Sequence, residues 1–343
     1  MPAGKAPAKV VKEGQRLAAG LDDVIPAKHV DRNLLIGTWN IRAFGDLADT
    51  WTGAGDGTVK RDLRALAHIG EVVSRFDVVA IQEVKGNLRA LRYLMKTLGP
   101  DWGFILTDTN RGEAGNDERL AFVFDLRRVK PSGLACELVL SDEDVGVAGA
   151  AKMVEQFART PYAVSFFSGN QTFLLVTLHV KWGKVPSDRL PELKRIAAWV
   201  ADWADEIQSW GQNLIVLGDF NIDRAGDAAY EAFTSTGLRT PDALNQVPRT
   251  VFAQQKNAFY DQIAWFTDDG TSRLTLEYTG RSGGFDFLPY VFTELQPQEV
   301  SWRMSDHVPL WCEFAMTRVG GLADHVPKPP ARSAPRGRRS RRR

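Results

Sequence analysis

Short apolar runs in this chain repeatedly meet a residue that can bind a metal ion or transfer a proton. The runs 34–39, 78–82, 173–178 and 214–218 end at Asn40, Glu83, His179 and Asp219, while Asp261 begins the run 262–266 and Asp306 and His307 precede the run 308–311. Short apolar runs bounded by polar residues predict buried strands, and functional groups gather where such strands end. The pattern predicts one site assembled from distant parts of the chain, with hydrolytic metal chemistry as the leading hypothesis.

Helical periodicity between these runs indicates an α/β fold. Apolar residues recur at helical spacing from Leu63 to Phe76, and the same pattern predicts helices over 89–98 and 187–210, the last capped by Ser187. The tryptophans of the 187–210 segment share a stripe with aliphatic residues, which favours core packing over a base-stacking surface. Further strands are expected over 102–108, 120–125, 133–140 and 162–168.

Composition predicts one catalytic domain between two loose ends. A chain of 343 residues that is 44% hydrophobic can bury a substantial core. Residues 1–31 are rich in Ala, Lys and Gly and are expected to form a flexible lead-in, although 15–21 could make a short helix. The catalytic domain is expected over 32–317, and the Pro, Gly and Arg content of 318–343 predicts a disordered basic tail.

The formal net charge of +1 hides an uneven distribution. Residues 318–343 contain nine Lys or Arg against the single Asp324, a net charge of 9 − 1 = +8, so the remainder sums to 1 − 8 = −7. An acidic body suits a carboxylate-rich cation site, and the basic tail would attract polyanions. A solubilising end is an equally good interpretation of the tail.

Cysteine usage and the absence of long apolar segments bear on location. Cys136 and Cys312 are the only cysteines, too few for a disulfide framework or a cysteine-based zinc site. Residues 1–13 lack the apolar core of a signal peptide, and no uninterrupted apolar segment approaches the ~20 residues that cross a bilayer. We therefore expect a soluble, cytoplasmic protein that does not associate with membranes.

Several of the residues at strand ends offer hard oxygen donors. Asn40, Glu83 and Asp306 carry the amide and carboxylate oxygens that Mg²⁺ or Mn²⁺ prefers. Asp219 and Asn221 are two positions apart, so an extended backbone would point both to one side, where they could bind a metal, orient a water or hold a phosphoryl oxygen. The alternative is an Asx-type turn after the strand, which these residue types favour.

Two of the five histidines adjoin predicted strands. His179 and His307 could each serve as general acid or base near neutral pH. His68 lies inside a predicted helix, where packing is expected, and His29 and His325 lie near the two ends. One histidine at a strand end is more often structural, but two beside acidic strand ends favour catalysis.

Short motifs in a fixed order resemble a known family. They are Asn-Ile-Arg-Ala-Phe-Gly (40–45), Gln-Glu-Val-Lys (82–85), Glu118 with Phe-Val-Phe (122–124), Arg-Thr-Pro (159–161), Ser-Phe-Phe-Ser (165–168), Leu-His (178–179), Gly-Asp-Phe-Asn (218–221), Tyr-Asp-Gln-Ile (260–263) and Ser-Asp-His (305–307). In this order, and spanning 34–314, they resemble the endonuclease/exonuclease/phosphatase superfamily and, within it, the pancreatic-type deoxyribonucleases.

The resemblance implies both a fold and an activity. The fold would be a four-layer α/β/β/α sandwich of two packed mixed sheets flanked by helices, with the site at one edge. The activity would be that of a phosphodiesterase that depends on Mg²⁺ or Mn²⁺, with Ca²⁺ as a further candidate for a structural ion. By similarity, Glu83 would be the principal metal ligand, helped by Asn40 and Asp306, and Asp219 and Asn221 would hold the attacking water, a second metal or the phosphate.

The same resemblance implies two imidazole–carboxylate pairs around the scissile phosphate. His307 would be oriented by Asp261 and His179 by Glu118, which raises the basicity of each imidazole and fixes its tautomer. The remaining positions implied by similarity are cationic: Arg159 matches a phosphate contact, and Arg42 and Lys85 match positions beside the DNA.

The sequence departs from the pattern of the secreted deoxyribonucleases at a disulfide bond and at two positions expected to contact DNA. Two cysteines that pair near the Asp219 and Asp261 segments in those enzymes are absent, Asn116 stands where a DNA-stacking tyrosine is expected, and Lys85 replaces an arginine. The leading hypothesis is a monomeric endonuclease that acts on DNA. The alternatives are a relative that hydrolyses inositol phosphates or sphingomyelin, and a nucleic-acid-binding protein without enzymatic activity.

Overall fold

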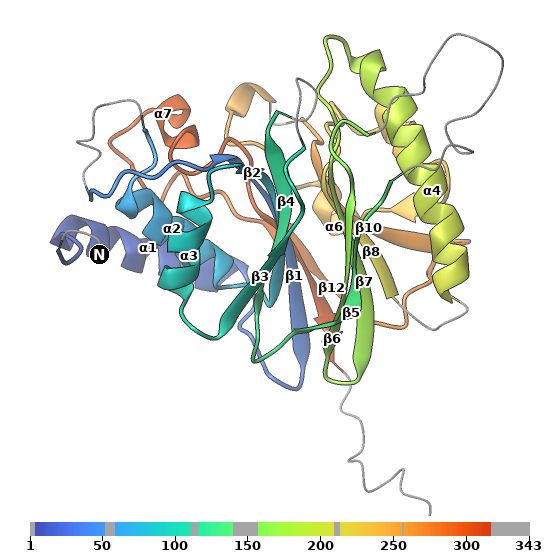
Figure 1. Cartoon of the computed structure of the whole chain (residues 1–343), viewed down its shortest axis with the longest axis horizontal. Helices are drawn as coiled ribbons and strands as arrows, with labels where there is room; N and C mark the ends of the chain where they lie inside the picture. The colour runs from blue at the N-terminus through green and yellow to red at the C-terminus, as the bar shows by residue number, and fades with distance from the viewer. Residues whose placement is uncertain are drawn as a thin grey trace, which may run out of the picture.

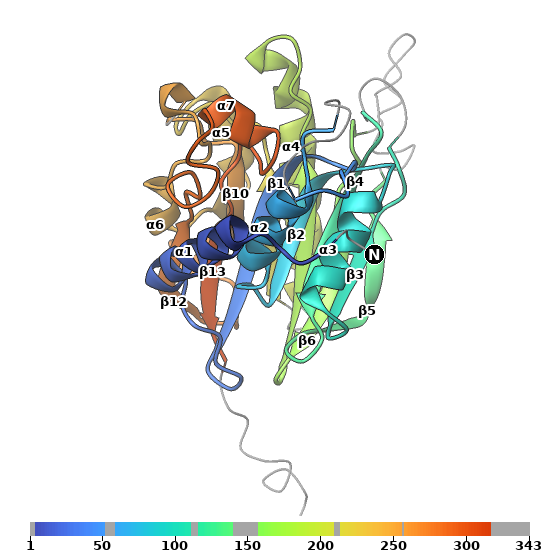
Figure 2. The ribbon, with the colours of Figure 1, turned by 90° about the vertical axis from the view of Figure 1, so that its left-hand side faces the viewer.

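Two mixed β-sheets packed face to face form the centre of the fold, and Figure 1 views them edge-on. The computed structural model describes residues 4–51, 59–110, 116–139, 157–208, 213–255 and 257–316. Helices cover the outer face of each sheet (Figures 1 and 2). The expected four-layer α/β/β/α sandwich is therefore confirmed.

The first sheet has the strand order β12-β13-β1-β2-β4-β3, and the second has the order β11-β10-β8-β7-β6-β5 with β9 paired to β10. The strands of the first sheet are β1 (Asn33–Phe44), β2 (Val78–Lys85), β3 (Trp102–Leu106), β4 (Glu118–Asp125), β12 (Tyr278–Gly284) and β13 (Leu310–Ala315). Those of the second are β5 (Lys130–Glu137), β6 (Tyr162–Ser168), β7 (Gln171–His179), β8 (Asn213–Asp219), β9 (Leu238–Arg239), β10 (Asp261–Asp268) and β11 (Thr271–Ser272).

Each sheet contains one parallel pair at its centre, and these pairs position the site. β1 is parallel to β2, and β7 is parallel to β8, whereas their other neighbours are antiparallel. These strands are buried on both faces, which explains their continuous apolar runs. Because parallel strands end at the same edge, the polar residues that follow the runs gather at that edge of each sheet.

The helices lie in two outer layers. α1 (Ala8–Val24), α2 (Leu63–Val73) and α3 (Arg89–Leu98) cover the first sheet, as Figure 2 shows, while α4 (Leu190–Gln208) and α5 (Ala228–Thr234) cover the second. The helix predicted over 187–210 begins as the 3₁₀ turn η1 (Pro186–Arg189), and its Trp199 and Trp203 pack against the apolar core beneath α4. The short elements α6 (Asp242–Asn245), η2 (Ala253–Gln255) and α7 (Pro297–Ser301) lie in connections.

The N-terminal segment differs from the flexible lead-in expected over 1–31. Much of it forms α1, which packs on α2 and buries Leu17 in the main core. The carboxylate of Glu13 is buried too, where Arg64 donates to both of its oxygens at 2.6 and 2.7 Å and His68 Nε2 lies 2.8 Å away. A buried ion pair of this kind requires an ordered helix, so the expectation is wrong for the residues of α1.

Three further expectations concern the C-terminal tail, membrane-spanning helices and the two cysteines. The basic tail over 318–343 lies outside the described residues, and its disorder stays a prediction. Among the helices that are described, none is long and apolar enough to cross a membrane. Cys136 and Cys312 are not joined in a disulfide bond.

Candidate active site

The ends of β1 and β2 are irregular where two of the predicted metal ligands lie. The pairing of β1 with β2 shifts after Asn40, and the pairing of β2 with β4 shifts around Glu83. Ala43 (φ 45°) and Glu83 (φ 60°) both adopt the left-handed backbone conformation, which is rare for non-glycine residues and concentrates at functional sites. The bulge turns the Glu83 carboxylate toward β1, where its Oε2 accepts a hydrogen bond from the Ala43 amide at 2.8 Å.

Asn40 and Asp219 connect the two sheets at this edge. Asn40 Nδ2 donates to Asp219 Oδ2 at 2.9 Å, and both side chains are buried. The amide oxygen of Asn40, Oδ1, is buried without a hydrogen-bond partner among the described residues. Gly218 (φ 136°) lets β8 lie close to β7 just before Asp219, because a Cβ there would lie 2.2 Å from the Leu178 carbonyl. An unpaired buried acceptor is costly, so this oxygen is suited to a cation or a polar substrate group.

Asp219 and Asn221 do not point side by side from an extended strand as expected. Asn221 has a φ of 52°, and its backbone N–H donates to Asp219 Oδ1 at 2.9 Å, which is an Asx-type turn. The Asn221 side chain turns away and donates from Nδ2 to the Val180 carbonyl at 2.6 Å. The turn therefore fixes the orientation of the Asp219 carboxylate.

Two histidines face Asp219, and an acid lies behind each of them. His307 Nδ1 lies 2.6 Å from Asp261 Oδ2, and its Nε2 lies 3.9 Å from Asp219 Oδ2. His179 Nε2 lies 3.6 Å from the same oxygen of Asp219. His179 Nδ1 is 3.1 Å from Glu118 Oε2, at ion-pair distance but without the alignment of a hydrogen bond. Two imidazole–carboxylate pairs thus converge on one buried carboxylate.

Electrostatics in this cluster favour the charged forms of His307 and Asp219, whereas burial raises the pKa of Asp261 to about 6. Burial alone would lower the pKa of His307, but the carboxylates of Asp261, Asp219 and Asp306 outweigh it and raise that pKa well above its usual value. Burial likewise raises the pKa of Asp219, but the nearby imidazoles, His307 first and then His179, lower it below its usual value. The arrangement therefore stabilises an imidazolium beside a carboxylate.

Glu118 is the centre of a second charged cluster. Its buried carboxylate accepts hydrogen bonds from Arg159 Nε at 2.6 Å, Lys85 Nζ at 2.8 Å and Asn116 Nδ2 at 2.5 Å. Burial raises its pKa, but His179, Arg159 and Lys85 together hold the pKa well below its usual value. Arg159 Nη1 is buried without a hydrogen-bond partner in the described part of the chain. This N–H group is suited to an anionic oxygen of a substrate.

Arg42 and Asp306 form the outer part of the site. Arg42 Nη1 lies 3.4 Å from Asp306 Oδ2 and donates to Ser301 Oγ at 2.8 Å, and its guanidinium lies over the Trp302 ring at 3.6 Å. Ser305 joins this part to β1, since its hydroxyl donates to the Asn40 carbonyl at 2.6 Å. The segment before β13 is thereby fixed against the end of β1.

The donor set fits a divalent cation. Within the described ranges, Asp219, Asp261 and His307 each offer a ligand atom, and these atoms lie within 4.8 Å of one another. The unpaired Asn40 Oδ1 adds a neutral oxygen beside them, and Glu83 adds a carboxylate at the bulged end of β2. Oxygen-rich sets of this kind are those that Mg²⁺ and Mn²⁺ prefer.

Two buried arginines support the site and were missed by sequence reasoning. Arg61 donates to the Arg42 carbonyl at 2.6 Å and the Ala43 carbonyl at 2.9 Å, and Arg249 Nε donates to the Asp261 carbonyl at 2.7 Å. Both bind backbone, so each fixes a strand end without touching the charged centre. A lone arginine between polar residues is typical of a surface position, and the sequence holds no sign of these contacts.

Comparisons with known proteins show the family of this chain. Residues 37–328 match the model of the Endonuclease/Exonuclease/phosphatase family. A deoxyribonuclease of Thioalkalivibrio sp. (strain K90mix) is 27% identical over 82% of this chain and 71% of its own length, and Deoxyribonuclease-1 of Bos taurus is 26% identical over 81% and 91%. The human Nocturnin catalytic domain with bound sulfate superposes with a TM-score of 0.54 at 17% identity, over 83% of this chain and 95% of that one. With the family model spanning most of the sequence, this chain belongs to the endonuclease/exonuclease/phosphatase family.

Proposed function

We propose that this chain is a divalent-metal-dependent phosphodiesterase that hydrolyses nucleic acid, most specifically a deoxyribonuclease-like endonuclease. One observation carries the proposal: Nε2 of His179 and Nε2 of His307 lie 3.6 and 3.9 Å from the same oxygen of Asp219. An acid lies beside the far nitrogen of each ring. Two imidazoles that face one point from different directions can serve the two proton transfers of in-line hydrolysis.

The proposed roles follow from these positions. One imidazole accepts a proton from the attacking water, which Asp219 helps to orient, and the other donates a proton to the leaving oxygen. Asp261 holds the tautomer of His307 through a hydrogen bond, and Glu118 orients His179 from ion-pair distance. Arg159 contacts a phosphoryl oxygen through its unpaired Nη1 and neutralises part of the developing charge. No covalent bond between protein and substrate is needed.

The proposed metal ligands are Glu83, Asn40 and Asp306, with Asp219 beside them. Asn221 is left out of this set, because its side chain turns away to the Val180 carbonyl. Mg²⁺ or Mn²⁺, when bound, supplies positive charge that stabilises the phosphoryl oxygens. Glu83 and Asn40 suit this role because the first is turned toward β1 by the bulge and the second keeps a free amide oxygen. A structural Ca²⁺ stays a separate prediction.

DNA as the substrate is supported by two independent observations. The curated relatives that match most of this chain are named deoxyribonuclease, at 26 and 27% identity. Arg42, Lys85 and Arg159 add positive charge around the buried acids, which suits a phosphate backbone. A monomeric state and a cytoplasmic location remain predictions from the sequence.

The test is a hydrolysis assay of the purified full chain with Mg²⁺. Substrates are plasmid DNA, single-stranded DNA, RNA, inositol phosphates and sphingomyelin. His307→Ala is expected to lower kcat on DNA by about 10²- to 10⁴-fold through loss of general acid–base catalysis. Glu83→Gln is expected to raise the Mg²⁺ concentration for half-maximal rate by at least about 10-fold. The matched controls, His29→Ala and Glu71→Gln, alter residues outside the site and should behave as wild type.

Each alternative gives a different result. Cleavage of an inositol phosphate or of sphingomyelin with intact nucleic acid would replace the substrate and keep the chemistry. Binding of DNA without hydrolysis of any substrate would favour the non-enzymatic alternative. Unchanged hydrolysis in both His307→Ala and Glu83→Gln would show that the assigned site is wrong.

A further inference from the structure

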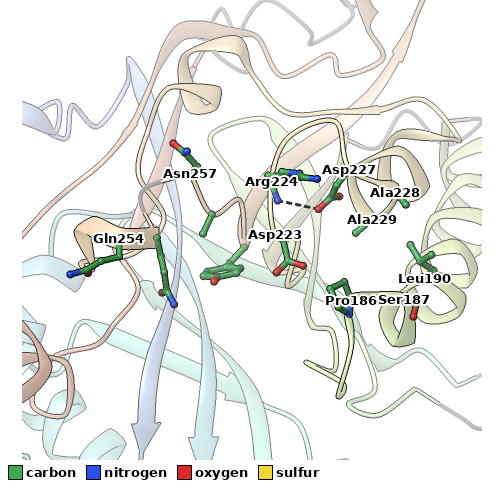
Figure 3. Close-up of a pocket in the computed structure, with 13 residues that line it drawn as sticks. Pro186, Ser187, Leu190, Asp223, Arg224, Asp227, Ala228, Ala229, Gln254 and Asn257 are labelled. Carbon is green, nitrogen blue, oxygen red and sulfur yellow. Dashed lines mark hydrogen bonds between the residues drawn. The ribbon is translucent and has the colours of Figure 1, made fainter.

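An open cavity of about 630 Å³ lies among the residues drawn in Figure 3. In Figure 3, Gln254 and Asn257 line one wall, and Asp223 and Asp227 line the other. Tyr260 also lines the cavity and is the residue before Asp261 of the catalytic cluster. Tyr260 therefore links the wall of the cavity to the neighbouring residue Asp261, which belongs to the proposed catalytic cluster.

Aromatic rings connect this cavity to the reacting groups. The Tyr260 ring lies 5.6 Å from the His307 ring on one side and 5.6 Å, edge to face, from the Trp182 ring on the other. Trp182 is 52% exposed, a large exposure for an indole. The rings form a continuous path from the catalytic imidazole to a surface tryptophan.

A buried arginine holds the exposed tryptophan in place. The Arg189 guanidinium lies over the Trp182 ring at 4.2 Å, and its Nε donates to the Trp182 carbonyl at 2.6 Å. The same guanidinium binds the Asn221 carbonyl at 2.5 Å and Asp223 Oδ1 at 2.9 Å. The indole is thus fixed to the site through both its ring and its backbone, which lowers the entropic cost of stacking a ligand on it.

The chemistry of the cavity differs from that of the phosphate side. The lining holds two carboxylates, Asp223 and Asp227, against one guanidinium, Arg224, a net charge of 1 − 2 = −1, which disfavours a phosphate group. Gln254, Gln255 and Asn257 offer exposed amides that can both donate and accept hydrogen bonds, as the edge of a nucleobase requires. The cations proposed to contact phosphate lie instead around Glu118 and Asp306.

We propose that Trp182, Tyr260 and this cavity form a subsite for one unstacked nucleoside of the strand that is cut. The inference rests on the proposed function and refines it: a base can stack on Trp182 only after it leaves its neighbours, so single strands and unpaired ends are the preferred substrates. Base–aromatic stacking of this kind tolerates any sequence, because every base has a stacking face. The amides of the cavity would bind the polar edges of the same nucleoside.

The experiment uses end-labelled single-stranded oligonucleotides of one sequence, each with an abasic spacer at a different position. With the wild-type chain and Mg²⁺, cleavage is expected to fall about 10-fold at one bond, which lies a fixed number of nucleotides from the spacer. Cleavage falls there because the spacer removes the base that would stack on Trp182. In Trp182→Ala this dip is expected to disappear, and KM for the intact strand should rise about 10-fold. Trp182→Phe should restore both, which excludes misfolding as the cause.

Phe167→Ala is the matched control, since Phe167 is an exposed aromatic residue near the far end of β6 from the site. It should behave as wild type. A dip of wild-type depth in Trp182→Ala, with DNA still cleaved, would overturn the subsite and leave the proposed function standing. If the wild type cleaves no strand, the proposed function fails, and fluorescence anisotropy with the oligonucleotide in EDTA decides the subsite: weaker binding by Trp182→Ala supports it, and equal binding overturns it.

Discussion

At the scale of single residues, Arg61 shows how a buried cation can position a site without entering it. Its guanidinium donates to the backbone carbonyls of Arg42, Ala43, Arg303 and Met304, at 2.6 to 3.2 Å. Burial lowers the pKa of Arg61 to about 10, so the guanidinium stays charged at neutral pH. The planar fork of N–H groups thereby joins the end of β1 to the segment that leads to β13.

Arg61→Lys tests this role. An ammonium has fewer donors and no planar fork, so carbonyls at the end of β1 would lose their partners, and the free energy of unfolding should fall by about 1–3 kcal/mol. Because Ala43 holds Glu83, the Mg²⁺ concentration for half-maximal hydrolysis should also rise, and excess Mg²⁺ should restore the rate. Urea unfolding and Mg²⁺ titration measure the two effects.

The control for that variant is Arg92→Lys, since Arg92 is exposed on α3 in the outer helix layer. It should change neither quantity. A loss of stability in Arg61→Lys with an unchanged Mg²⁺ requirement would mean that Arg61 supports the fold alone.

Single residues could be predicted where a polar side chain directly follows an apolar run in the sequence. Asn40 and Asp219 could be singled out because each ends an apolar run, and their catalytic roles stay predictions. Whether Asn221 followed in extended or turned conformation could not be decided, since Asp-x-Asn suits both and only the backbone at φ 52° distinguishes them. Arg61 and Arg249 could not be found, because their partners are backbone carbonyls whose positions exist only after folding.

At the scale of secondary-structure elements, α1 is fastened by one buried carboxylate. Glu13 binds Arg64 and His68 of α2 and accepts the backbone N–H of Phe292 at 2.5 Å. Burial raises the pKa of Glu13, but His68, Arg64 and the Phe292 amide outweigh it and hold that pKa well below its ordinary value of 4.5. Arg64 also lowers the pKa of Glu294, to about 2.

These shifts predict acid-labile docking of α1. Folding lowers both pKa values, so the stability that the two carboxylates contribute is complete above pH 4.5 and is lost as the pH falls toward 2. Glu13→Gln should lower the free energy of unfolding by about 3–5 kcal/mol at pH 7, because it leaves Arg64 buried with a weaker partner. It should also flatten the dependence on pH below 4.5. Urea unfolding at a series of pH values measures both.

Glu71→Gln serves as the control, because Glu71 of α2 makes a surface ion pair with Arg75, which lies just after the end of the same helix. Such pairs contribute about 0–1 kcal/mol, and its acid dependence should match the wild type. An acid transition of unchanged steepness in Glu13→Gln would contradict the assignment of that transition to α1.

The sequence pattern predicts some helices more clearly than others. α2 and α3 carry a continuous apolar stripe, and both begin and end close to the predicted bounds. α1 buries Leu17 and Leu21 between lysines and alanines, a stripe too sparse to separate from a loose end. Its order comes from the Glu13–Arg64 pair, and a contact between residues 51 positions apart leaves no local pattern.

At the scale of the whole molecule, the site exists only because two sheets meet. Asn40 and Glu83 come from the first sheet, and His179, Asp219 and Asp261 come from the second. Periodicity could predict the strands but not which sheet each would join, since pairing is a non-local property. The order of the motifs along the chain, by resemblance to a known family, supplied the four-layer arrangement.

Gln82 is placed to hold the two sheets in register beneath the site. Its buried Nε2 donates to Thr38 Oγ1 on the neighbouring strand at 3.1 Å and to Thr177 Oγ1 on the opposite sheet at 2.9 Å. Gln82 directly precedes Glu83, and Thr177 lies two residues before His179. Any slip between the sheets at this bond would therefore change the distance between Glu83, a proposed metal ligand, and His179.

Gln82→Leu should act on both stability and rate. Loss of the amide leaves the Thr177 hydroxyl buried without its partner, which costs about 1–3 kcal/mol, and kcat should fall about 10-fold as the two halves of the site lose alignment. Gln82→Leu with Thr177→Val removes both members of the bond between the sheets. It should recover part of the stability without recovering the rate, since the Thr38 hydroxyl still lacks its Gln82 partner. Urea unfolding and single-turnover cleavage separate the two quantities. Recovery of rate and stability together in the double variant would mean that the bond contributes to folding alone and that the geometry of the site is fixed at its edge, by Asn40 and Asp219.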